Sequence, residues 1–262
     1  MSKIEWCDET WNPITGCSPI SEGCQNCYAK RMATRLRGRF GYPKGDPFKV
    51  TIHDEKFYST WKNRKIARYW TAPRKIFVCS MGDLFHENVR NLELYRILKI
   101  IQENPHCTFM VLTKRAERAK KYFTEDYCKS FGDYQTEKFV KEQMNTVGIK
   151  NLWLGVTAEN QKRADERIPT LLQIPAAVRF VSVEPMLEPI SIRSPAARGR
   201  GFREFDWINK IDWVIAGPET GPKARPCKPE WIEDLYEQCK VAGIPFFDKR
   251  KTGWLAREYP KT

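Results

Sequence analysis

Three cysteines near the start of the chain have a spacing that can hold an iron–sulfur cluster. Cys17, Cys24 and Cys27 form the pattern Cys-x6-Cys-x2-Cys. Cluster irons take thiolate ligands, and three thiolates hold three of the four irons of a [4Fe–4S] cluster. The fourth iron is then an open coordination site for a small molecule. The pattern therefore predicts a cluster that takes part in chemistry.

A structural zinc is the alternative use of the same cysteines, with one further ligand such as Cys7. Zinc sites of that kind normally use two close cysteine pairs, and this chain has one Cys-x2-Cys pair. Cys79 and Cys107 lie in or beside predicted strands, where we expect their thiols to pack in the core. His53 and His86 lack the spacing of a metal-binding pair and are expected in core or surface roles.

Length and composition favour one folded domain. The chain has 262 residues and no linker rich in Gly, Ser or Pro, which predicts a single domain over residues 1–262. No apolar run approaches the roughly 18 residues of a membrane span. The first residues lack the apolar stretch of a secretory signal, and the nine cysteines are odd in number. We therefore expect a soluble, cytoplasmic protein with reduced thiols and no membrane partner.

The charge balance points to a polyanionic partner. Lys and Arg number 45 against 32 Asp and Glu, a net charge of +13, which favours nucleic acid. Residues 38–72 combine glycines, prolines and a basic aromatic stretch, and are predicted to be an insertion. Either it is a positively charged flap whose aromatics stack on bases, or it is a solvated loop with core aromatics. For residues 194–204, with Arg198, Arg200 and Arg203, the solvated loop is the preferred interpretation.

Short apolar runs alternate with longer amphipathic segments along the chain. Strands are predicted at Ile76–Ser80, Thr108–Thr113, Leu152–Thr157, Val178–Val183, Trp213–Ala216 and Ile244–Phe247. Helices are predicted at Leu92–Glu103, Glu137–Val147, Glu159–Leu172 and Pro229–Ala242, the last ended by Gly243. This βα repeat predicts an α/β fold with a partial or closed parallel (β/α) barrel of the TIM type, and a doubly wound open sheet is the alternative.

Polar residues follow five of the predicted strands. In a parallel barrel the carboxyl ends of all strands meet at one rim, so these side chains and the cysteines are expected to line one cavity. For single residues such as Asp83, Thr157 and Glu159, capping of the helix that follows is the simpler explanation. In chain order the candidates are Ser80, Asp83, Lys114, Arg115, Thr157, Glu159, Asn160, Ser182, Glu184 and Glu219.

The chain resembles a known family in ordered blocks along its whole length. It is similar to uncharacterised phage-associated proteins that are grouped with the radical S-adenosylmethionine enzymes. The blocks include Thr10-Trp11-Asn12-Pro13, Gly23-Cys24-Gln25-Asn26-Cys27-Tyr28, Ser80-Met81-Gly82-Asp83-Leu84-Phe85-His86, Trp153-Leu154-Gly155-Val156-Thr157-Ala158-Glu159-Asn160 and Ser182-Val183-Glu184-Pro185.

This resemblance implies a [4Fe–4S] cluster on Cys17, Cys24 and Cys27 that binds and cleaves S-adenosylmethionine, giving a 5′-deoxyadenosyl radical that abstracts hydrogen from the substrate. Two features depart from the wider superfamily. Six residues rather than three separate the first two cysteines, and Asn26 stands where an aromatic residue usually precedes the third. The usual Gly-Gly-Glu sequence is also replaced by Ser80-Met81-Gly82-Asp83.

The resemblance also implies roles by position. Tyr28 is expected near the adenine, and Ser80 and Asp83 at the methionine amino group. Lys114 and Arg115 are assigned to the methionine carboxylate or a substrate phosphate, and a surface salt bridge is the alternative, with more weight for Arg115. The remaining roles are ribose or carboxylate binding for Thr157, Glu159 and Asn160, cofactor or substrate binding for Ser182 and Glu184, and a ribose or substrate amine for Glu219.

The expected substrate is a nucleic-acid base or nucleotide, specifically a modified thymine in phage DNA that is altered by an isomerase or lyase reaction. RNA modification and DNA repair by the same chemistry are alternatives, and a nucleic-acid-binding protein with structural zinc is a third. A flavodoxin- or ferredoxin-type protein is the expected electron donor, in a bacterial or phage-infected cell. The sequence predicts no oligomeric state.

Overall fold

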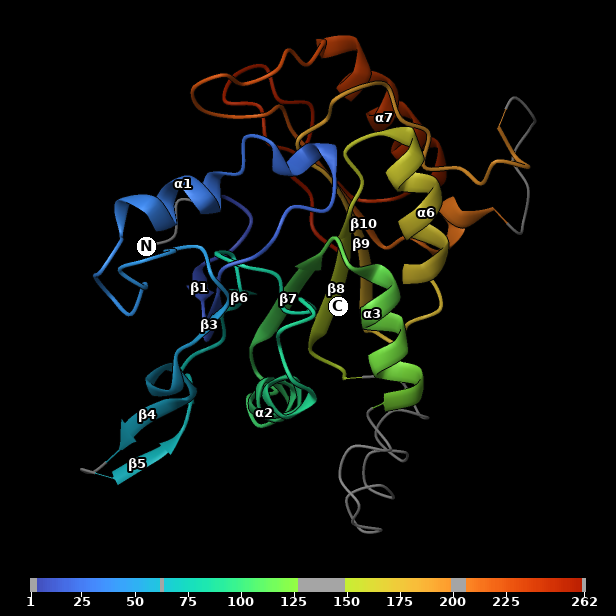
Figure 1. Ribbon diagram of the computed structural model, residues 1–262. Coiled ribbons are helices and arrows are strands. Elements are labelled where there is room, and N and C mark those ends of the chain that lie inside the picture. The colour runs from blue at the N-terminus through green and yellow to red at the C-terminus, as the bar shows by residue number, and fades with distance from the viewer. Residues whose placement is uncertain (1–3, 62–63, 127–148, 199–205, 261–262) are drawn as a thin grey trace. The chain divides into compact units, whose positions relative to one another are not determined.

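The computed structural model describes residues 4–61, 64–126, 149–198 and 206–260 (Figure 1). These residues fall into two compact units. The first consists of Met1–Pro19, Cys27–Trp153 and Ile174–Ala177, and the second of Ile20–Asn26, Leu154–Gln173 and Val178–Thr262. The short segment that carries Cys24 is therefore part of the second unit, while Cys17 and Cys27 belong to the first.

The first unit is built on three parallel strands. β1 (Glu9–Trp11) pairs with β6 (Lys75–Val78), and β6 pairs with β7 (Thr108–Thr113). Two antiparallel pairs accompany them: β2 (Ile14–Thr15) with β3 (Thr51–Ile52), and β4 (Tyr58–Trp61) with β5 (Arg64–Ala67). The helical elements are α1 (Tyr28–Arg35), η2 (Asp54–Phe57), α2 (Asn91–Gln102), α3 (Ala116–Lys121) and the π-type turn η3 (Tyr122–Asp126).

The second unit also has a parallel core. β10 (Trp213–Ala216) lies between β9 (Val178–Val183) and β11 (Phe246–Asp248). Its helical elements are η1 (Glu22–Cys24), α6 (Gln161–Leu171), η4 (Trp207–Lys210) and α7 (Pro229–Ala242). β8 (Leu152–Thr157) begins with residues of the first unit and ends in the second. Gly155 on β8 has no room for a side chain, since a Cβ there would lie 2.4 Å from the Phe180 ring.

The strand order confirms the predicted fold class. The seven parallel-sheet strands follow the order β1-β6-β7-β8-β9-β10-β11, and helices connect strands along the chain. This is an α/β fold with a partial parallel (β/α) barrel, because β1 and β11 end the order of the described strands rather than pairing with each other.

Most predicted element bounds agree with the structure. β7, β8, β9, β10 and α7 begin and end at the predicted residues, and Gly243 ends α7 in the left-handed conformation at φ 68°. Buried runs rich in β-branched residues explain the strands, since every residue of β8 and β10 is buried. β6 ends two residues earlier than predicted and β11 starts two residues later. The predicted helix Glu137–Val147 lies outside the described residues.

The aromatic residues of the predicted insertion at residues 38–72 divide between buried and exposed positions. Phe48, Phe57 and Trp70 are buried core residues, which agrees with the loop interpretation for those rings. Phe40 and Tyr69 are exposed. In the second basic segment, Arg198 forms an ion pair with Asp165, while Arg200 and Arg203 lie outside the described residues.

The helices that the structure describes include none with the length and apolar character needed to cross a bilayer.

Candidate functional site

Cys17 is held against the loop that follows β6. Gly16 donates its backbone N–H to the Met81 carbonyl at 2.9 Å and forms a parallel bridge with Gly82. Gly16 has φ +87°, and a Cβ there would lie 2.2 Å from the Lys49 carbonyl oxygen. Only glycine fits this backbone and this close approach. The sequence thereby places Cys17 at the carboxyl end of β6.

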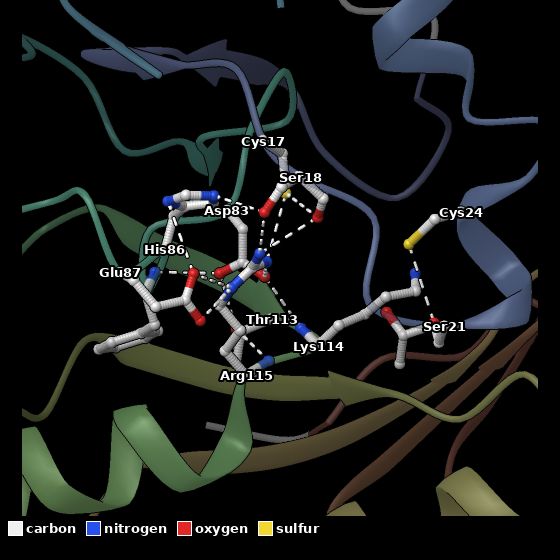
Figure 2. A network of polar contacts seen from close by, with 12 residues as sticks. Cys17, Ser18, Ser21, Cys24, Asp83, His86, Glu87, Thr113, Lys114 and Arg115 are labelled. Atoms are coloured by element: carbon white, nitrogen blue, oxygen red, sulfur yellow. Dashed lines mark hydrogen bonds and ion pairs between the residues drawn. The ribbon is translucent and has the colours of Figure 1, made fainter. Parts of the chain in front are cut away.

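The buried guanidinium of Arg115 contacts Cys17 directly (Figure 2). Arg115 Nη1 lies 3.3 Å from Cys17 Sγ and 3.3 Å from Asp83 Oδ2. Its Nη2 donates to the Ser18 carbonyl at 3.1 Å and to Ser18 Oγ at 3.0 Å. A fixed cation beside a cysteine sulfur favours the thiolate, which is the form that binds metal.

Asp83 anchors this guanidinium. Its carboxylate accepts hydrogen bonds from Thr113 Oγ1 at 2.7 Å and from the backbone N–H groups of Phe85 and Lys114. Burial opposes the charge of Arg115, but Asp83 and Cys17 outweigh it and raise the pKa of Arg115 above its ordinary value. Arg115 is thus a permanent cation, 3% exposed, between β7 and the Cys17 segment.

This placement corrects the sequence-based ranking of two adjacent residues. The surface salt bridge considered for Arg115 does not describe its main contacts, because its side chain is buried against Asp83 and Cys17. It also pairs with the exposed Glu87. Lys114, the preferred candidate, contributes its backbone N–H to Asp83, and its side chain is half-buried.

His86 extends the network through Ser18. His86 Nδ1 accepts the backbone N–H of Asn88 at 3.1 Å, so the neutral ring carries its proton on Nε2 and donates it to Ser18 Oγ, 2.8 Å away. Burial, followed by the charge of Arg115, lowers the pKa of His86. The neutral ring therefore orients Ser18, whose oxygen also accepts from Arg115.

Cys27 and Tyr28 bring α1 to the same loop. Cys27 occupies the N-cap position of α1, directly before the first helical residue. Tyr28 donates its hydroxyl hydrogen to the Ser80 carbonyl at 2.5 Å. Cys17 and Cys27 both pack against one apolar cluster, formed by Ala29, Ala33, Tyr42 and Phe48. Within the first unit, the structure thus brings Cys17, Cys27, Tyr28, Ser80 and Asp83 into one neighbourhood.

In the second unit, Glu159 holds the segment that carries Cys24. Its fully buried carboxylate pairs with Arg167 at 2.8 Å and accepts the backbone N–H of Gly23 at 3.4 Å. Arg167 also donates to the Thr157 carbonyl at 2.7 Å. A charged pair of this kind at the end of β8 fixes the residue next to Cys24. Ser21 Oγ lies 3.8 Å from Cys24 Sγ.

Glu219 holds the other end of that segment. Its carboxylate accepts from Asn26 Nδ2 at 2.9 Å and forms a two-pronged pair with Arg225, at 2.6 and 3.0 Å. The hydrogen bonds from Arg225 lower the pKa of Glu219 to about 2. Arg225 also donates to the Glu22 carbonyl at 3.0 Å. The Cys24 segment is therefore fastened to residues that follow β8 and β10.

The other candidates of the second unit have structural partners. Asn160 caps α6 by accepting the Arg163 N–H at 2.9 Å. Thr157 and Ser182 are buried, and the Ser182 carbonyl accepts the Ala158 N–H. Glu184 pairs with Lys249 at 2.5 Å.

Cysteine thiols are the donor type that iron–sulfur clusters take. None of the three motif cysteines is in a disulfide, each is partly accessible, and Cys17 and Cys27 have cationic or helix N-terminal surroundings. Among the described residues no group of three or more His, Cys, Asp or Glu side chains is already gathered as a metal site.

Cys7 does not fit as a fourth zinc ligand. It precedes β1, and the next residue, Asp8, pairs with Lys75 at the amino end of β6. Cys17 lies at the carboxyl end, beyond the Gly16–Gly82 bridge. The length of β6 between them is about 10 Å, whereas zinc ligands share one ion at about 2.3 Å.

Three arginines hold the carboxylates described above: Arg115, which ranks below Lys114 among the sequence-based candidates, and Arg167 and Arg225, which are not among them. Each pairs with a predicted carboxylate, respectively Asp83, Glu159 and Glu219. Buried carboxylates at strand ends need cationic partners, and this requirement is the feature of the sequence that could have pointed to these arginines.

A family model described as "Protein of unknown function (DUF5131)" matches residues 1–262. The comparisons with curated proteins and with solved structures found no match.

Proposed function

The chain belongs to the DUF5131 family along its whole length, and from its own residues we propose that it is a radical S-adenosylmethionine enzyme that acts on a nucleic-acid base or nucleotide. The observation that carries the proposal is the contact between Cys17 and buried Arg115 at the carboxyl ends of β6 and β7. Active sites of (β/α) barrels lie at these strand ends.

When bound on Cys17, Cys24 and Cys27, a [4Fe–4S] cluster with S-adenosylmethionine supplies one-electron cleavage of the cofactor and hydrogen abstraction from the substrate. The chain's residues prepare that chemistry. Arg115 donates to Cys17 Sγ and so favours negative charge on that sulfur, and Glu159 and Glu219 fasten the segment that carries Cys24. Tyr28 and Ser80 are the proposed cofactor contacts near α1.

The net charge of +13 supports a polyanionic substrate. Within that class we propose a modified thymine in phage DNA, altered by an isomerase or lyase reaction, with RNA modification and DNA repair as alternatives of the same chemistry. A flavodoxin- or ferredoxin-type donor in a reducing cytoplasm would supply the electron.

The test is made on protein purified and reconstituted without oxygen. Iron and zinc are measured, followed by the electron paramagnetic resonance spectrum with and without S-adenosylmethionine and an assay for 5′-deoxyadenosine. We expect about four irons per chain, a spectrum changed by the cofactor, and 5′-deoxyadenosine. Stoichiometric zinc without a cofactor response would instead favour a structural metal in a nucleic-acid-binding protein.

The matched variants are Cys24→Ala and Cys227→Ala. Both cysteines are half-buried and outside disulfides, but only Cys24 belongs to the motif. Cys24→Ala should lose most of the iron while its fold persists, and Cys227→Ala should keep both. Equal iron in the two variants would contradict the proposed ligand set.

A further inference from the structure

A basic loop with an exposed aromatic tip begins at the last residue of α1. This Phe40 loop, residues 35–49, contains five Lys or Arg residues and one acidic residue. Phe40 is 75% exposed, the same value as Val241 and the highest among the exposed large apolar side chains of the described residues. Arg35, Arg37, Arg39, Lys44 and Lys49 are exposed around it.

The loop is rigid enough to present this ring. Gly38 donates to the Tyr42 carbonyl at 3.0 Å, and Tyr42 donates to the Arg39 carbonyl at 2.9 Å. Arg37 donates to the Gly45 carbonyl at 2.8 Å, and Arg39 bonds the Arg35 carbonyl. At the base of the loop, Tyr42 and Phe48 are buried in the apolar cluster.

Phe40 itself adopts an unfavourable conformation. Its φ is +51°, in the left-handed region that side chains other than glycine rarely adopt. Gly38 and Gly41 on either side also have positive φ, at 69° and 83°. A strained turn thus holds a large apolar ring in water. Strained residues cluster at active sites and at positions that clamp ligands.

The base of the loop connects it to the proposed site. Tyr42 and Phe48 belong to the same apolar cluster against which Cys17 and Cys27 pack. A ligand held on the Phe40 loop is therefore held by the structural element that also supports two of the three motif cysteines.

We propose that the Phe40 loop binds an unpaired nucleic-acid strand, with Phe40 stacked on a base and the surrounding Arg and Lys side chains on phosphates. Stacking on aromatic rings combined with cations along the backbone is the way proteins bind single strands. Enzymes that act on a base need it outside the stack, and an aromatic tip stabilises that state. This inference rests on the proposed function for its substrate class.

An anionic membrane surface fits the loop less well. Interfacial binding needs an apolar face with several inserted side chains. Here the apolar side chains at the base, Tyr42 and Phe48, are buried, which leaves Phe40 as the loop's exposed ring.

The test measures binding of the full-length protein to labelled 12-mers by fluorescence anisotropy. The arms are single-stranded DNA, single-stranded RNA of the same sequence, duplex DNA, and vesicles with anionic lipid. We expect the single strands to bind more tightly than the duplex, and the DNA and RNA arms identify the preferred sugar. Vesicles that bind with the same dependence on Phe40, while the oligonucleotides do not bind, would overturn the proposal.

Two substitutions at position 40 separate the ring from the turn. Phe40→Gly suits the left-handed backbone and removes the ring, so binding should weaken roughly five- to 150-fold. Phe40→Trp keeps a stacking ring and should bind within about twofold of the parent. Equal binding by Phe40→Gly and the parent would overturn the stacking role.

A lysine of the loop and a control lysine elsewhere test the contribution of charge to strand binding. Lys44→Gln should reduce the slope of log affinity against log salt by about 0.7, the value for one phosphate contact on a single strand. Lys162→Gln, an exposed lysine on α6, should leave the slope unchanged. Equal slopes for Lys44→Gln and the parent would mean that Lys44 makes no phosphate contact.

Iron content and the response to S-adenosylmethionine are measured on the same Phe40→Gly sample. Normal values with weakened binding support the loop as a substrate surface. If the parent binds single strands through Phe40 but holds no iron, the radical function fails while the binding surface stands.

Discussion

Arg115 Nη1 lies 3.3 Å from Cys17 Sγ, so the first cysteine of the motif has a buried cation as its hydrogen-bond partner. Asp83 holds that cation through an ion pair with side chains only 3% and 7% exposed. Charges in such a dry environment act strongly on their neighbours. The pair therefore both stabilises the fold and sets the electrostatic surroundings of Cys17.

Replacing Arg115 should make a cluster on Cys17 harder to reduce. A reduced cluster is more negative, and a cationic donor to its ligand sulfur stabilises that state. Arg115→Gln should shift the reduction potential downward by on the order of 50 mV, equivalent to about 1 kcal/mol of hydrogen-bond free energy. Redox titration followed by electron paramagnetic resonance measures the shift. Lys162→Gln, at an exposed position of α6, is the control, and an unchanged potential in Arg115→Gln with full iron content would contradict the prediction.

Breaking the Glu159–Arg167 pair should destabilise the second unit. Glu159 is fully buried and Arg167 is 6% exposed, so Glu159→Gln leaves an uncompensated buried charge. The free energy of unfolding should fall by about 3–5 kcal/mol, measured by urea denaturation. Glu166→Gln removes the exposed partner of Arg163 and should change stability by less than about 0.5 kcal/mol. Similar decreases in the free energy of unfolding of the two variants would mean that burial of the ion pair does not decide how much stability its loss removes.

The elements were predictable where burial dictates residue type. β7, β8, β9 and β10 are largely buried runs of mostly apolar residues, and short runs of this kind are typical of strands covered on both faces. β1 was missed because Glu9 and Thr10 are half-buried and the strand has three residues. Its pairing with β6, far along the chain, decides its conformation.

The sequence indicates where the candidate residues stand along the chain, but not which side chains they contact. The cysteine spacing and the strand-end carboxylates are visible in the sequence, and Asp83, Glu159 and Glu219 do contact the cysteine segments or their supports. Lys114 and Arg115 are adjacent cations, and only the direction in which each side chain leaves the strand separates them. That direction depends on tertiary packing.

Acid should weaken the anchor formed by Glu219. The folded-state pKa of about 2 lies below the ordinary value of 4.5, so its ion pair contributes stability above pH 4.5. This contribution should be lost as the pH falls from about 4.5 to 2. Chemical denaturation at pH 6, 4 and 2.5 should show the stability advantage of the parent over Glu219→Gln shrinking across this range. The pKa of Glu22 is also lowered to about 2, but Glu22 is present in both proteins, so its contribution cancels in the stability difference. A constant difference between the two proteins would contradict the ion pair.

Gly16→Ala should displace Cys17 and destabilise the first unit. The new Cβ would lie 2.2 Å from the Lys49 carbonyl oxygen, at a backbone φ of +87° that alanine adopts only with strain. Neither backbone partner is a flexible side-chain end, so the Cys17 segment must move. The free energy of unfolding should fall by at least about 2 kcal/mol, and iron bound after reconstitution should fall with it.

Gly45→Ala is the matched control, because a Cβ at Gly45 meets nothing within 4 Å. It should change stability by less than about 0.5 kcal/mol and leave the iron content unchanged. If Gly16→Ala were to lose stability but bind iron normally, then the close approach at Gly16 would serve the fold alone, and the position of Cys17 would tolerate movement of its segment. Loss of iron at nearly full stability would instead tie the glycine to the cysteine that follows it.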